Sequence, residues 1–160
     1  MNKRDYACCF IGHREIEVTE ELKSKVTKII ENLIKYNNVY TFLFGSKSKF
    51  DSLCRMIVTE LKEKKYPHIK RIYVRAEYPH IDADYENYLL QSFEYTYFPK
   101  RVENAGRAAY VRRNLEMIDT SKYCVAYYIR TYTPINRNSG TKIAYDYAIE
   151  NGSVVINAAE

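Results

Sequence analysis

Short apolar runs alternate with longer amphipathic segments along the whole 160-residue chain, and this alternation restricts the fold more than any other feature. The clearest apolar runs are residues 6–12 (YACCFIG), 39–45 (VYTFLFG) and 123–129 (YCVAYYI). Continuous apolar runs of this length are typical of strands that are covered on both faces. We therefore predict a sheet that is buried between two layers of helices.

The segments between these runs carry apolar residues at helical spacing. In residues 19–36, one stripe contains Leu22, Val26, Ile30 and Leu33, and Thr19 is the expected N-cap. The same reasoning predicts further helices at about 50–61, 82–91, 106–120 and 139–151, the last of which ends at Gly152. Further strands are expected at 69–76, 93–98 and 153–157.

Strands that alternate with helices of ten or more residues imply βαβ units and parallel pairing. We predict a single α/β domain over residues 1–160, a Rossmann-like three-layer sandwich with a mainly parallel sheet of five or six strands. Ligands of such folds bind outside the carboxyl ends of the strands. The loops that follow the predicted strands are therefore the places to look for a site.

Composition narrows the functional classes only slightly. The chain has 25 Lys and Arg against 20 Asp and Glu, a net charge of +5, and it has 17 Tyr and no Trp. This mild basic charge is compatible with an anionic ligand and makes nucleic-acid binding an unfavoured alternative. The apolar runs are far shorter than the roughly 20 residues that a membrane span requires, and the first run ends at Gly12, which disfavours a signal peptide. We expect no membrane association and a cytoplasmic location.

The four cysteines, Cys8, Cys9, Cys54 and Cys124, form no CxxC pair, and no histidine lies at metal-ligand spacing from them. Cys8 and Cys9 are consecutive in a predicted strand, so their side chains should point to opposite faces. We expect all four to be small buried hydrophobic residues in a reducing compartment, with no metal and no cofactor. The alternative is a reactive thiol at Cys8 or Cys9.

Two loops resemble anion cradles. Gly45-Ser46-Lys47-Ser48-Lys49-Phe50-Asp51 runs from a strand directly into a helix, and Asn138-Ser139-Gly140-Thr141 precedes the last helix. A glycine with hydroxyl residues at a helix N-terminus can turn backbone N–H groups toward an anion. The alternative is ordinary capping, by Ser48 or Asp51 in the first loop and by Ser139 in the second. If both loops are cradles, they should meet at one edge of the sheet.

Two further regions could contribute to a site. Gly12-His13-Arg14 follows the first strand, where an imidazole and a guanidinium could bind phosphate or transfer a proton, or could form a solvated polar turn. The helix after Gly106 carries a basic set that should lie away from its apolar stripe of Val111, Leu115 and Ile118, either as a solvated face or as a binding surface. The set consists of Arg107, Arg112 and Arg113, followed by Asn114, together with Lys100 and Arg101 just before the helix. The tyrosine-rich segment 77–104 has no assigned role, although exposed aromatic residues are compatible with a homodimer.

Four motifs together resemble the SLOG superfamily, which includes the DNA-processing protein DprA/Smf and the LOG nucleotide phosphoribohydrolases. The similar branch is the small bacterial YpsA-like group, and the similarity covers nearly the whole chain. The motifs are CCFIGHR at 8–14, FGSKSKFDSLC at 44–54, YVRRNLEMIDTSKYCVAYY at 110–128 and SGTKIAYDYAIENGSVVIN at 139–157.

The resemblance implies a Rossmann-like fold that binds a nucleotide-type ligand at the strand ends. Carried over by position, the ligand-binding residues would be Gly12, His13, Arg14, Gly45, Ser46, Ser48, Asp51, Arg113, Asn114, Ser139, Gly140 and Thr141. Two positions depart from the family pattern, because Lys49 and Ser139 stand where the family often has glycine. In addition, the LOG enzymes have a glutamate just after the turn that corresponds to Thr141, whereas this chain has no carboxylate before Asp146.

Three functions follow as hypotheses. The leading one is binding or sensing of a nucleotide or nucleotide-derived molecule, without catalysis, with a base stacked on a tyrosine of segment 77–98. The second is a nucleotide N-glycosidase that uses Asp51 or Asp119 as its carboxylate, since such chemistry needs a carboxylate near the ribosyl centre. The third is DprA-like binding of single-stranded nucleic acid by the basic set.

Overall fold

The computed structural model describes residues 2–130 and 140–160. Six strands form one sheet in the order β4-β3-β2-β1-β5-β6, and every neighbouring pair is parallel. The strands are β1 (Ala7–Gly12), β2 (Thr41–Phe44), β3 (Lys70–Val74), β4 (Tyr95–Tyr97), β5 (Tyr123–Tyr127) and β6 (Val154–Asn157). The predicted Rossmann-like α/β architecture is therefore confirmed, with six strands.

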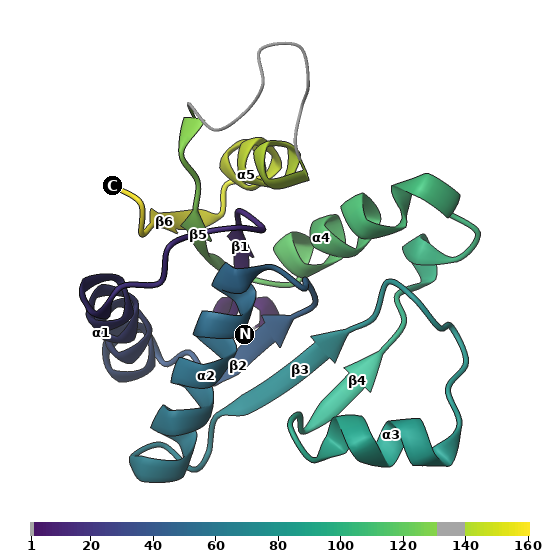
Figure 1. The fold of residues 1–160 in the computed structure, drawn as a ribbon, viewed down its shortest axis with the longest axis horizontal. Coiled ribbons are helices and arrows are strands. Elements are labelled where there is room, and N and C mark those ends of the chain that lie inside the picture. The colour runs from purple at the N-terminus through teal and green to yellow at the C-terminus, as the bar shows by residue number, and fades with distance from the viewer. Residues whose placement is uncertain (1, 131–139) are drawn as a thin grey trace.

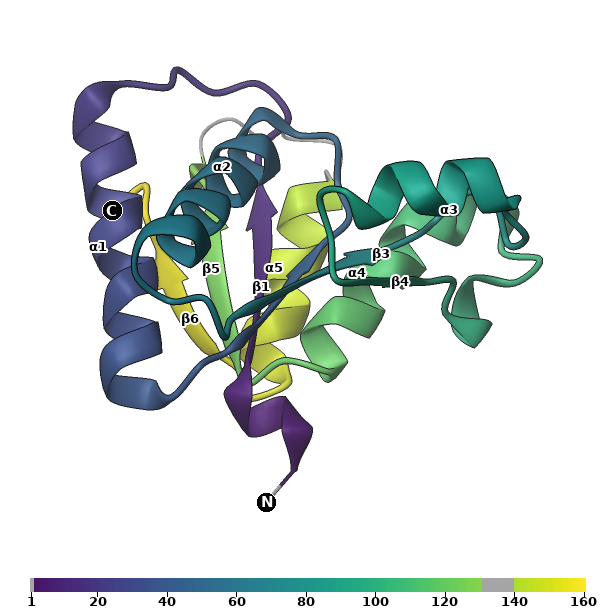
Figure 2. The ribbon, with the colours of Figure 1, turned by 90° about the horizontal axis from the view of Figure 1, so that it is seen from below.

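The helices cover both faces of this sheet, as Figures 1 and 2 show. They are α1 (Glu20–Asn37), α2 (Lys49–Lys64), α3 (Ala83–Leu90), α4 (Ala109–Asp119) and α5 (Gly140–Glu150). Helices α1 and α2 pack on one face in a core that contains Phe10 and Phe42, and α4 and α5 pack on the other in a core that contains Ile11 and Leu43. Alternate residues of the same strand thus enter different cores, as the period of two in a strand requires.

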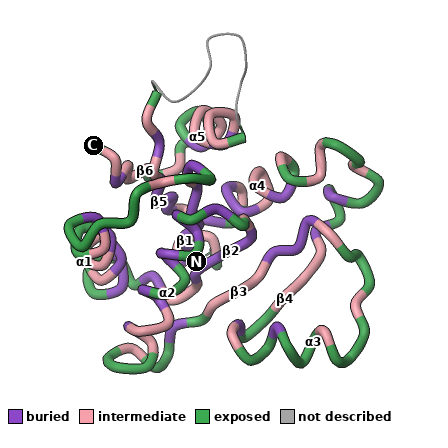
Figure 3. Tube along the Cα trace, viewed as in Figure 1, coloured by how far each residue is buried: buried purple, intermediate pink, exposed green. Residues whose placement is uncertain are grey.

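Burial is concentrated in the central strands, and α3 at the β4 end is largely exposed (Figure 3). All four cysteines are buried and free, and Cys8 and Cys9 enter opposite cores as predicted. Neither Cys8 nor Cys9 has any exposed surface, and burial raises the pKa of the Cys8 thiol well above its usual value. The alternative of a reactive thiol at this pair therefore has no accessible sulfur to support it.

The inner face of α4 differs from the prediction. Its buried residues are Arg113, Met117 and Ile118, whereas Val111 and Leu115 are only partly buried. The helix is rotated so that a guanidinium, and not an aliphatic stripe, lies against the end of the sheet. A helical-wheel argument places arginine outside because it does not foresee polar partners for a buried cation.

No helix in residues 2–130 and 140–160 combines the length and the apolar character that crossing a membrane requires. In the same part of the chain, no three His, Cys, Asp or Glu side chains converge on a point where a metal ion could be held.

Candidate ligand-binding pocket

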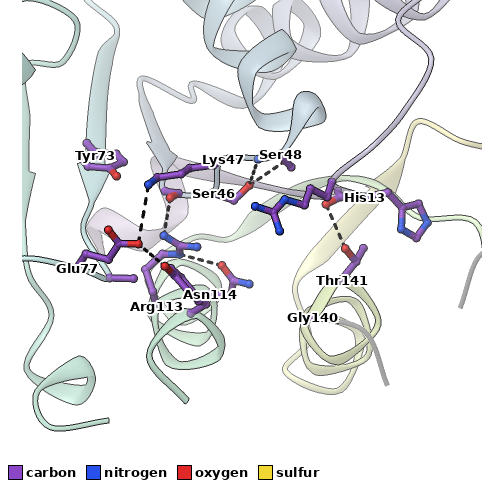
Figure 4. A pocket seen from close by; sticks show the side chains of 15 residues that line it. His13, Ser46, Lys47, Ser48, Tyr73, Glu77, Arg113, Asn114, Gly140 and Thr141 are labelled. Carbon is purple, nitrogen blue, oxygen red and sulfur yellow. Dashed lines mark hydrogen bonds and ion pairs between the residues drawn. The ribbon is translucent and has the colours of Figure 1, made fainter. Parts of the chain in front are cut away.

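A pocket of about 430 Å³ lies at the carboxyl ends of β1, β2 and β3 and is bounded below by α4 and α5 (Figure 4). It is lined by Gly12, His13, Arg14, Gly45, Ser46, Lys47, Ser48, Tyr73, Ala76, Glu77, Tyr110, Arg113, Asn114, Gly140 and Thr141. The chain order reverses beside this pocket, because β2 and β5 flank β1 on opposite sides. This is the position at which open parallel sheets place their ligands.

Ten of the residues proposed from the sequence meet in this one pocket. They are Gly12, His13, Arg14, Gly45, Ser46, Ser48, Arg113, Asn114, Gly140 and Thr141. Ser139 lies outside the described residues. Asp51 does not line the pocket, and Asp119 lies at the other edge of the sheet. The two predicted cradles therefore do share one edge, as far as the described residues define them.

The turn after β2 (residues 45–48) is closed by the protein's own acceptors, so the prediction that its amides are free for an anion is wrong for most of them. The N–H groups of Gly45 and Ser46 face the carboxylate of Asp51 and lower its pKa, and that of Ser48 bonds the Ser46 hydroxyl at 3.1 Å. The Ser48 hydroxyl caps α2 by accepting from the Asp51 N–H at 3.0 Å. Only the N–H of Lys47 in this turn has no acceptor among the described residues.

Asp51 is a buried internal acceptor and not a residue of the pocket wall. Its side chain is 5% exposed, and its Oδ1 has no hydrogen-bond partner within the described residues. Burial raises the pKa of Asp51 to about 7, although Arg113, Arg55 and the two amides of the turn oppose that rise. The sequence prediction that Asp51 contacts ligand or acts as a catalytic carboxylate is therefore not supported, because the group faces the turn's own backbone.

Arg113 holds the same turn from the other side. Its guanidinium donates to the carbonyl oxygen of Gly45, and its Nε donates to the Asn114 side chain at 3.0 Å. A Cβ at position 45 would lie 2.6 Å from the Arg113 Cδ, so only glycine permits this contact. Arg113 is 4% exposed, which overturns its assignment to a solvated basic face.

His13 is held in place by the segment that follows β5. Its Nε2 accepts a hydrogen bond from the Ile129 N–H at 2.8 Å, which places the proton of the neutral ring on Nδ1. Its ring packs against Tyr127 and Tyr128, and burial lowers the pKa of His13 below its usual value. His13 therefore contributes a neutral wall and joins the loop after β1 to the end of β5.

The start of α5 differs from the turn after β2. The Thr141 hydroxyl donates to the Gly12 carbonyl at 3.1 Å, which fixes α5 against the end of β1. Within the part of the chain that the structure describes, neither Gly140 nor Thr141 uses its backbone N–H in a hydrogen bond. Helix N-termini attract anions through such amides and through the helix dipole.

Five pocket residues were not predicted: Lys47, Tyr73, Ala76, Glu77 and Tyr110. The Tyr110 hydroxyl donates to Glu77 Oε1, and the Lys47 ammonium lies 3.9 Å from the same oxygen. The Arg113 guanidinium lies over the Tyr110 ring, 5.7 Å from its centroid. Glu77 follows the end of β3, so the rule that directs attention to strand ends could have found it. Tyr110 carries no comparable signal, because nothing in its local sequence separates it from a surface tyrosine.

The tyrosines of segment 77–98 do not line the pocket, contrary to the expectation that one of them would stack on a base. The tyrosines that line it are Tyr73 on β3 and Tyr110 on α4. Tyr73 stacks on Phe93, with ring centroids 5.2 Å apart.

Asp119 is excluded as a catalytic group by its position. It ends α4 at the amino edge of the sheet, where its backbone carbonyl accepts from Arg4, which precedes β1. Its carboxylate pairs with Arg101 at 2.8 Å and accepts from the Tyr147 hydroxyl at 2.7 Å. These partners explain why a carboxylate is tolerated near a helix C-terminus, where the dipole disfavours it.

The basic set before and on α4 also presents fewer unpaired, exposed positive charges than the sequence suggests. Arg101 pairs with Glu116 at 3.2 Å as well as with Asp119, and Arg113 is buried. Lys100, Arg107 and Arg112 remain exposed. Arg101 is exposed too but ion-paired, and three exposed cations without an ion pair among the described residues are few for a surface that binds nucleic acid mainly through phosphate neutralisation. The DprA-like hypothesis therefore gains no support here.

Comparison with known proteins does not identify a relative: no family model matches the chain, and no curated protein is significantly similar to it.

Proposed function

We propose that this chain binds a nucleotide or nucleotide-derived small molecule in the pocket and acts as a sensor or sequestering module. The observation that carries the proposal is the convergence of three cations, a helix N-terminus and a half-exposed tyrosine in one cavity of about 430 Å³. Cavities of a few hundred Å³ are typical of small-molecule sites. The resemblance to the SLOG superfamily favours the same class of ligand.

Charge favours a phosphorylated ligand. Arg14, Lys47 and Arg113 against the one carboxylate of Glu77 give the described pocket lining a net formal charge of +2. A phosphate monoester carries roughly −1.5 to −2 at neutral pH. Arg14 is exposed at the end of β1, and the N–H groups of Gly140 and Thr141 lie at the start of α5. These groups are the expected contacts of the phosphate.

Tyr110 is suited to stack on a base. One face of its ring lies under the Arg113 guanidinium, its hydroxyl is bonded to Glu77, and the residue is still 53% exposed. A ring held at two points loses little conformational entropy on binding, and its exposed surface is free for an aromatic partner. We expect the base to lie on this ring.

The placement of the carboxylates favours binding over N-glycosidic cleavage. Asp119 is at the opposite edge of the sheet, and Asp51 faces the turn after β2. Glu77, which does line the pocket, is bonded to Tyr110 and lies beside Lys47. A nucleotide recovered intact after incubation with the protein would agree with this assignment, whereas release of free base would contradict it.

The test is a thermal-shift screen of nucleotides, including NAD- and ADP-ribose-like compounds, followed by calorimetric titration of any compound that stabilises the protein. We expect at least one nucleotide to raise Tm, and Arg14→Ala to weaken its binding by about tenfold, as loss of one charge-assisted contact does. Arg107→Ala is the matched control, since Arg107 is also an exposed arginine but does not line the pocket. If no nucleotide changes Tm, the proposal fails.

A further inference from the structure

Glu77 gives the pocket two chemically different ends. Figure 4 shows Glu77 and Tyr73 on one side of Arg113 and Asn114, and Thr141 and Gly140 on the other. The α5 end offers backbone N–H donors to an anion. At the other end, Glu77 is the only carboxylate among the described residues of the lining. An anionic group would be repelled there, and a hydrogen-bond donor would be attracted.

One oxygen of Glu77 remains available for that donor. Oε1 accepts from the Tyr110 hydroxyl and lies 3.9 Å from the Lys47 ammonium. Oε2 has no partner within the described residues. The contacts at Oε1 hold the carboxylate in place beside the Tyr110 ring, on which the base is proposed to stack. Oε2 is therefore an acceptor at the edge of the base and not at the phosphate.

We propose that Glu77 makes the pocket selective for nucleoside monophosphates whose base presents an amino group, and against those with a carbonyl oxygen at the same position. This inference rests on the proposed function. Adenine and cytosine carry such an amino group, and hypoxanthine and uracil carry a carbonyl there. An ionised carboxylate only accepts hydrogen bonds, so it bonds the amino group and repels the carbonyl oxygen.

The experiment uses two matched pairs of probes, AMP with IMP and CMP with UMP, titrated calorimetrically into the full chain. Within each pair a carbonyl replaces the amino group and the neighbouring ring nitrogen changes from an acceptor to an N–H donor. Tighter binding of IMP and UMP would mean that the carboxylate accepts from that ring N–H and would overturn the proposal. We expect the amino member to bind about tenfold more tightly, the lower end of what a hydrogen bond to a charged group contributes at a partly exposed site. In Glu77→Gln, whose carboxamide both donates and accepts, the preference should fall to within about twofold.

Glu15→Gln is the matched control. Glu15 is also an exposed glutamate paired with a lysine, Lys49 at 2.8 Å, but it does not line the pocket. Its variant should keep the full preference. Melting curves of both variants establish that they are folded, and Glu77→Gln should melt close to the parent because its side chain is partly exposed.

The outcomes separate the two proposals. If none of the four nucleotides binds but another nucleotide of the screen does, the selectivity proposal is wrong and the proposed function stands. If all four bind with equal affinity, or if the preference persists in Glu77→Gln, Glu77 is not the determinant. If a 2′-deoxy probe binds much more weakly than its ribose counterpart and only that difference disappears in Glu77→Gln, the carboxylate reads the sugar, and the amino-group assignment is overturned. If no nucleotide of any kind binds, the proposed function itself fails.

Discussion

The turn after β2 and the start of α5 look alike in sequence but differ in what they offer a ligand. Both have glycine and hydroxyl residues at the N-terminus of a helix, and both line the same pocket. The amides of the first turn face Asp51 or bond Ser46, whereas the N–H groups of Gly140 and Thr141 have no acceptor within residues 2–130 and 140–160. A glycine-and-hydroxyl turn is therefore open to anions only where no acidic side chain of its own helix reaches back to it.

The acidic side chain that closes the first turn is Asp51, in the first turn of α2. It satisfies backbone donors and compensates the charge of the buried Arg113, which in turn donates to the carbonyl of Gly45. This turn is thus a structural support for the pocket. The start of α5, with Arg14, is the part that binds the anion in our proposal.

The strongest test of this division is Asp51→Ala. The variant leaves a buried guanidinium without its carboxylate and leaves two turn amides without an acceptor. A buried donor left without its acceptor costs about 1–3 kcal/mol, and the guanidinium also loses a compensating charge. Urea unfolding near pH 8 should show this loss. A loss below about 1 kcal/mol would mean that the turn is not held by Asp51.

The pH dependence of stability gives a second test of Asp51. Its pKa of about 7 in the folded chain lies above the value of 3.8 expected without burial, so between these values the folded chain holds the proton more tightly. The free energy of unfolding should then fall as pH rises from about 4 to about 7, relative to Asp51→Asn, which cannot titrate. His13, whose pKa is lowered by burial, changes stability in the opposite direction and is common to both proteins. Identical pH profiles for the two proteins would contradict the assignment.

The two glycines of the compared turns should respond differently to alanine. At position 45 a Cβ would meet the Arg113 Cδ at 2.6 Å and the Val74 carbonyl oxygen at 2.9 Å, so Gly45→Ala should lose about 1–3 kcal/mol by overpacking. At position 140 a Cβ meets no atom of residues 2–130 or 140–160 within 4 Å, so Gly140→Ala should stay within about 0.5 kcal/mol of the parent. Thermal and urea unfolding measure both effects. Equal losses would remove the structural distinction between the turns.

A small effect is also expected of Asp119→Asn. The ion pair with Arg101 is partly exposed and lies at the far edge of the sheet, so its loss should cost less than about 1 kcal/mol. Affinity for any nucleotide found in the screen should not change. A large loss of binding in this variant would show that the described pocket is not the site.

The fold could be predicted from the sequence because the order of strands and helices depends on local residue patterns. The apolar runs of β1, β2 and β5 and the N-caps Thr19 and Ser48 each depend on a few neighbouring residues. The rule that ligands bind outside the carboxyl ends of parallel strands then identified ten of the pocket residues, although no contacts were known. The rule could do this because parallel strands present all their carboxyl ends on one side.

Contacts between distant residues could not be predicted in this way. Arg113 is buried because it reaches the Gly45 carbonyl, 68 positions earlier in the chain. Asp51 was a candidate catalytic group because the sequence does not show that its carboxylate faces the backbone amides of Gly45 and Ser46. Tyr110 was missed for the same reason, since its significance arises only when β3 and α4 are brought together.

Gly12 restricts how a pocket of this kind can diversify. A Cβ at this position would lie 2.4–2.6 Å from the buried side chain of Phe50, so even one methyl group would push α2 away from the end of β1. The same glycine carbonyl accepts from Thr141, which ties α5 to the same point. Substitution of Gly12 would therefore disturb the packing of α2 and α5 against β1. We expect changes in ligand preference to arise instead by substitution of side chains at the rim of the pocket, such as Arg14, Lys47, Glu77 and Tyr110.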